Sequence, residues 1–132
     1  MLFRSAAKYL QEGAQKRPKD ADIQFGLARA FAPSNQKLAT RHLESALEFN
    51  TNLVAARLFL ADYHIDAEDY DEAEKELKLV LNLNPWQPEA WAYRAVLSHL
   101  HSDSTGETNA RATALKFWPS NPEVDQIGRA HV

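Results

Sequence analysis

Apolar residues recur along this chain at spacings of three and four, which is the period of an amphipathic α-helix. Leu53, Ala56 and Leu60 form one apolar stripe, and Ala73 and Leu77 form another after a polar break. The pattern predicts helices over residues 2–15, 23–31, 34–49 and 52–66, a helix that follows Asp69 and ends at Asn84, and two helices that open at Pro88 and Ser104.

Several of these segments end in similar short sequences. Val80–Pro85 and Ala114–Pro119 are similar and lie 34 positions apart. Ala46–Thr51 is an earlier copy, again 34 positions before, with threonine in place of proline. Gly13–Pro18 precedes that copy by 33 positions. A fixed period of this length indicates a stack of similar structural units.

Small residues keep the same period. Ala61 and Ala95 lie 34 positions apart, as do Ala39 and Ala73. Helices that cross at close distance need small side chains at the crossing. We therefore expect these alanines at the contacts between paired helices.

Polar residues at the predicted helix starts indicate capping. Asp69 with Glu72, and Ser104 with Glu107, have the spacing of a capping box, and Ser34 opens the helix after Pro33. The residue before Pro85 avoids the α region, so Asn84 ends its helix.

The 34-residue period and its residue pattern resemble the tetratricopeptide repeat (TPR) of bacterial-type arrays. Residues 54–87 match the motif with Leu60, Ala61, Tyr70, Ala73, Leu77 and Pro85, and depart from it with Arg57, His64 and Val80. Residues 88–121 match with Trp91, Ala95, Ala114 and Pro119. Residues 20–53 match with Leu27, Ala28, Phe31, Ala39, Leu43 and Ala46, with a turn one residue short.

The resemblance implies an all-α fold, a right-handed superhelix of antiparallel helix pairs (a TPR α-solenoid). About three repeats would form a single domain over residues 1–132, with partial helices at its ends. Residues 1–19 would be the unpaired helix of a partial repeat, and residues 122–132 the start of a truncated helix. Residues 127–132 equal one reading frame of a common sequencing adapter, so we expect an artefact there; the alternative is a native tail.

The resemblance also implies that a partner protein or peptide binds in a concave groove lined by the first helix of each repeat. The expected groove residues are Asp22, Phe25, Arg29, Leu58, Asp62, Ile65, Glu89, Val96 and His99. Several of them could instead pack against neighbouring helices. Only Arg29 is basic among the positions that clamp a terminal carboxylate in some relatives, so that subclass does not fit.

The composition and charge of the chain argue against nucleic-acid, membrane and metal binding. The net charge of −3 with interspersed signs gives no case for nucleic acid or an anionic membrane. No apolar run approaches a transmembrane length, and no signal segment is evident, so the cytoplasm is the default expectation. His99 and His101 are two positions apart and would point apart on a helix, so we expect no metal and no cofactor.

No catalytic motif is present in the sequence. We therefore expect a non-enzymatic scaffold. One alternative is a TPR segment of a larger enzyme, for example beside a zinc peptidase domain, and another is a structural spacer. Self-association through Leu115, Phe117 and Trp118 is a further expectation, since the helix that would cover them is truncated.

Overall fold

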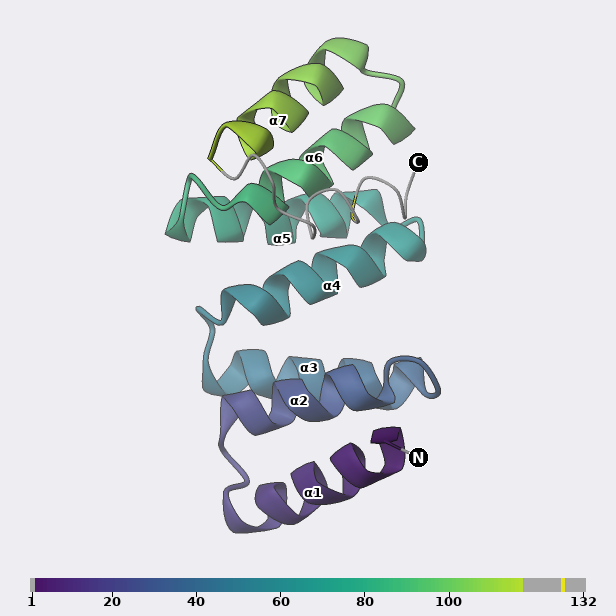
Figure 1. Cartoon of the computed structure of the whole chain (residues 1–132), viewed down its shortest axis with the longest axis vertical. Helices are drawn as coiled ribbons and strands as arrows, with labels where there is room; N and C mark the ends of the chain where they lie inside the picture. Colours follow the sequence, from purple (N-terminus) through teal and green to yellow (C-terminus); the bar gives the residue numbers. More distant parts are fainter. Residues whose placement is uncertain (1, 118–126, 128–132) are drawn as a thin grey trace. The chain divides into compact units, whose positions relative to one another are not determined.

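The computed structural model describes residues 2–117 and residue 127. Within these residues the chain forms seven helices and no strand (Figure 1). The helices are α1 (Leu2–Lys16), α2 (Ala21–Phe31), α3 (Gln36–Phe49), α4 (Val54–Asp66), α5 (Tyr70–Leu83), α6 (Pro88–Leu100) and α7 (Ser104–Phe117). The predicted all-α class is therefore confirmed. None of the described helices combines the length and the apolar character needed to cross a membrane.

The chain divides into two compact units, Met1–Ala56 and Arg57–Val132, and each is described by itself. The single repeat domain, its boundaries and the sense of its superhelix remain predictions. The predictions for Trp118, for the truncated helix at residues 122–126 and for residues 128–132 lie outside the described residues.

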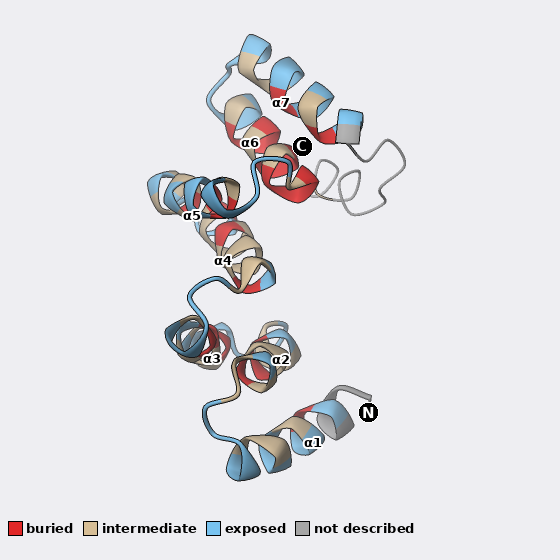
Figure 2. Cartoon of the chain, turned by 90° about the vertical axis from the view of Figure 1, so that its left-hand side faces the viewer, coloured by how far each residue is buried: buried red, intermediate tan, exposed pale blue. Residues whose placement is uncertain are grey.

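In the first unit, α2 lies between α1 and α3. Leu27 and Ala28 of α2, and Leu43 and Ala46 of α3, are almost completely buried. Figure 2 shows buried residues where α2 and α3 face each other. A Cβ atom on Gly26 would lie 3.0 Å from Leu10 Cδ2. Glycine at this position therefore allows α1 to approach α2 closely.

In the second unit, α4 pairs with α5 and α6 pairs with α7. Ala61 and Ala73 are fully buried, as are Leu77 and Val80 of α5, and Ala95 is 4% exposed. The small residues thus lie in the core, as the period predicts. Because alanine has no side chain beyond Cβ, the leucine and valine beside it fill the remaining space.

Polar side chains also join the helices of a pair. His42 Nδ1 of α3 donates to Gln24 Oε1 of α2 over 2.8 Å. Arg57 of α4 forms a 2.9 Å salt bridge with Glu76 of α5. The residue that departs from the tryptophan of the repeat motif, Arg57, therefore has a structural partner of its own.

Two of the expected N-caps are off by one residue, and one cap bond is absent. Asn35, not Ser34, caps α3 by accepting from the Leu38 N–H at 3.1 Å. Asp103, not Ser104, accepts from the Gly106 N–H at 2.9 Å at the start of α7. Asp69 holds the N-cap position of α5 but makes no side-chain cap bond.

The Asp69 carboxylate lies 3.8 Å from His64 Nδ1 instead of over the helix end. Glu72 of the same predicted capping box accepts from Lys75 Nζ at 2.8 Å. Glu107, the glutamate of the other predicted capping box, contacts His99 and Arg111 with its carboxylate oxygens. In each case a nearby basic side chain competes with the backbone for the carboxylate.

The turns inside the last two repeats have the same geometry. Glu68 and Ser102, 34 positions apart, adopt φ values of 60° and 59°. This left-handed conformation directs the chain from one helix into the next, and the following N–H donates back over 2.8 Å (Asp69 to His64) and 2.7 Å (Asp103 to Ser98). The first repeat turns differently, because α2 ends at Phe31 just before Pro33.

Candidate protein-binding face

The predicted groove residues of the second unit lie on α4 and α6. Leu58 and Asp62 of α4 are half-buried, and Ile65 is 4% exposed. On α6, Val96 is 2% exposed and Glu89 is 9% exposed. Leu58 and Asp62 are therefore more accessible than Ile65 and Val96.

Tyr93 connects the two first helices of this unit. Its hydroxyl on α6 donates a hydrogen bond to the Asp62 carboxylate on α4. Burial raises the pKa of Tyr93 well above its ordinary range, and the negative charge of Asp62 raises it further. The phenol therefore stays neutral and remains a hydrogen-bond donor toward the Asp62 carboxylate.

Charges are segregated between the two sides of these first helices. Arg57 of α4 reaches Glu76, and Arg94 of α6 reaches Glu74 at 3.2 Å, so both guanidinium groups turn toward α5. Asp62 and Glu89 are gathered around Tyr93, whose pKa both raise. The face at Tyr93 is consequently acidic.

Glu89 lies in the first turn of α6 at the end of a short chain of polar contacts. The Gln87 amide donates to the Glu89 carboxylate. The Asn84 amide in turn donates to Gln87 Oε1 at 3.1 Å. A helix N-terminus favours a negatively charged side chain, and Glu89 occupies this position in α6.

The two histidines at the end of α6 have different partners. His99 donates to Glu107 of α7 at 3.1 Å, and the His101 ring meets the Tyr70 ring edge-on at 5.4 Å between centroids. They do not face one another, as their spacing predicts. Within the described part of the chain, no group of three His, Cys, Asp or Glu side chains could hold a metal ion.

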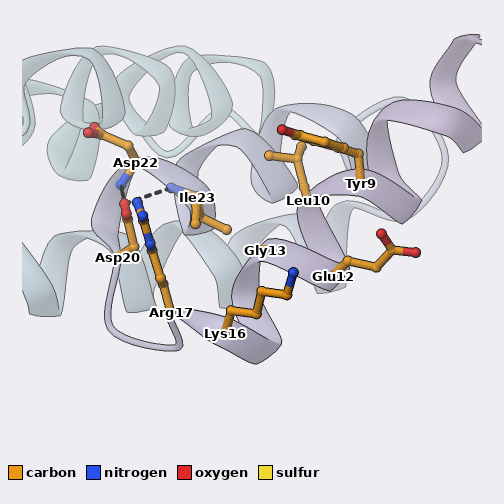
Figure 3. A pocket seen from close by; sticks show the side chains of 9 residues that line it. All are labelled: Tyr9, Leu10, Glu12, Gly13, Lys16, Arg17, Asp20, Asp22 and Ile23. Atoms are coloured by element: carbon orange, nitrogen blue, oxygen red, sulfur yellow. Dashed lines mark hydrogen bonds between the residues drawn. The ribbon is translucent and has the colours of Figure 1, made fainter.

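The predicted groove residues of the first unit lie on α2. The Arg29 guanidinium stands over the Phe25 ring, 5.8 Å from its centroid, in a cation–π contact. Asp22 is exposed and does not join them. It borders a cavity of about 560 Å³ between α1 and α2 instead (Figure 3).

Ile127 is the described residue that lies beyond α7. Its partly buried side chain packs with Trp91 against the buried Ala92 and Ala114. Leu115 on α7 is 40% exposed, which leaves the predicted self-association surface open at that residue.

Tyr93 is not among the groove residues that the sequence predicts. The signal that points to it is its period, since it lies 34 positions after Phe59 and both are aromatic. Its bond to Asp62 depends on the spacing of α4 and α6, which the period alone does not specify.

The model of the tetratricopeptide repeat family matches residues 35–97, from the N-cap of α3 to Leu97 in α6. No curated protein shows a significant match to the chain.

Proposed function

From the premise that the chain contains tetratricopeptide repeats, we propose that the acidic face of α4 and α6 binds a partner segment carrying basic and apolar side chains. Repeats of this family generally mediate protein–protein interactions and are typically non-catalytic. The observation that supports the proposal is the hydrogen bond between Tyr93 and the Asp62 carboxylate. Arg57 and Arg94, the arginines of α4 and α6, pair with acids of α5 instead of with Asp62.

The chemistry of the face supports an occupant of this kind. Asp62 is half-buried, so a lysine or arginine bound to it would be partly shielded from water, which strengthens the pair. Leu58 lies one helical turn before Asp62 and is also half-buried. A basic side chain followed by an apolar one in the partner would fit these two positions.

The experiment is selection of random peptides on the full chain, followed by affinity measurement with the enriched peptides. We expect enrichment of lysine or arginine beside leucine or another apolar residue. Asp62→Asn should weaken binding by about tenfold, because it removes a charge yet keeps an acceptor for Tyr93. Glu44→Gln is the matched control, since it removes one exposed charge on α3.

Enrichment of acidic peptides, or equal losses for Asp62→Asn and Glu44→Gln, would contradict the acidic face as the binding site. Arg29→Glu tests the α2 part of the predicted groove separately. Basic peptides bound only through α4 and α6 should keep their affinity in that variant.

A further inference from the structure

We draw no further inference here: the strongest candidate, the cavity of about 560 Å³ between α1 and α2, has both acidic and basic side chains in its lining, and nothing in the structure shows what covers it.

Discussion

Arg57 of α4 and Glu76 of α5 are joined by a 2.9 Å salt bridge in which each side chain is only 15% exposed. The same two positions of the preceding repeat hold Gln24 and His42, which share a 2.8 Å hydrogen bond. The same positions of the following repeat hold Trp91 and Ala110. The same pair of positions thus holds a salt bridge in one repeat, a neutral hydrogen bond in another and two apolar residues in the third.

The first prediction concerns this pair. Glu76→Ala should lower the free energy of unfolding by about 2 kcal/mol, because it leaves the half-buried Arg57 guanidinium unpaired. Arg57→Trp combined with Glu76→Ala, which copies the following repeat, should come within about 1 kcal/mol of the unmodified chain. Urea unfolding measures both. A double variant as unstable as Glu76→Ala alone would show that the loss does not arise from the unpaired charge.

Stability should fall in mild acid because of His42. Burial lowers the pKa of His42 in the folded chain. The unfolded state, with an ordinary pKa of about 6.5, therefore binds more protons, and stability is lost as pH falls through that value. The urea midpoint should drop between pH 7.5 and pH 5.5, and less so in His42→Gln. Equal drops in the two proteins would assign the effect to the other titratable groups.

Glycine should stabilise the turns. Glu68 and Ser102 have positive φ, which costs a residue with a Cβ about 1 kcal/mol. Glu68→Gly should therefore raise the free energy of unfolding by about 0.5–1 kcal/mol, despite the greater entropy of the unfolded chain. Glu44→Gly in the middle of α3 is the control and should destabilise by about 1 kcal/mol. A destabilised Glu68→Gly would mean that the turn is not strained.

Enlarging an interhelical alanine should be costly. Ala73 is fully buried, so Ala73→Leu should destabilise the chain by about 1–3 kcal/mol by forcing neighbouring side chains apart. Ala112→Leu places the same side chain at an exposed position of α7 and should change stability by less than about 0.5 kcal/mol. Similar thermal midpoints for the two variants would contradict the close contact at Ala73.

The fold could be predicted because its determinants are local and periodic. Ala61 and Ala73 mark helix contacts, and the 34-residue spacing places them without any coordinates. The N-caps were harder to place, since Ser34 and Asn35 are both capable of capping and stand side by side. A difference of one residue in the start of a helix is decided by φ and ψ, which the pattern of residue types does not determine.

The candidate site was less predictable for a different reason. The first-helix register places the predicted groove on α4 and α6, but the chemistry there depends on contacts between side chains distant in sequence. The bond of Tyr93 to Asp62 and the turning of Arg57 toward Glu76 together make one side acidic. Both follow from helix packing, and neither appears as a motif.

The unlike pairs Gln24–His42, Arg57–Glu76 and Trp91–Ala110 have a consequence for assembly of the chain. The first helices resemble one another, as do the second helices, so a helix could join the wrong neighbour while the protein folds. Such an exchange would set Trp91 against Glu76 or leave Arg57 facing Ala110, with a carboxylate or guanidinium buried without a partner. The paired residues therefore favour contact between the two helices of the same repeat. A chain in which single helices are exchanged between repeats should fail to fold, whereas a chain in which whole repeats are exchanged should fold.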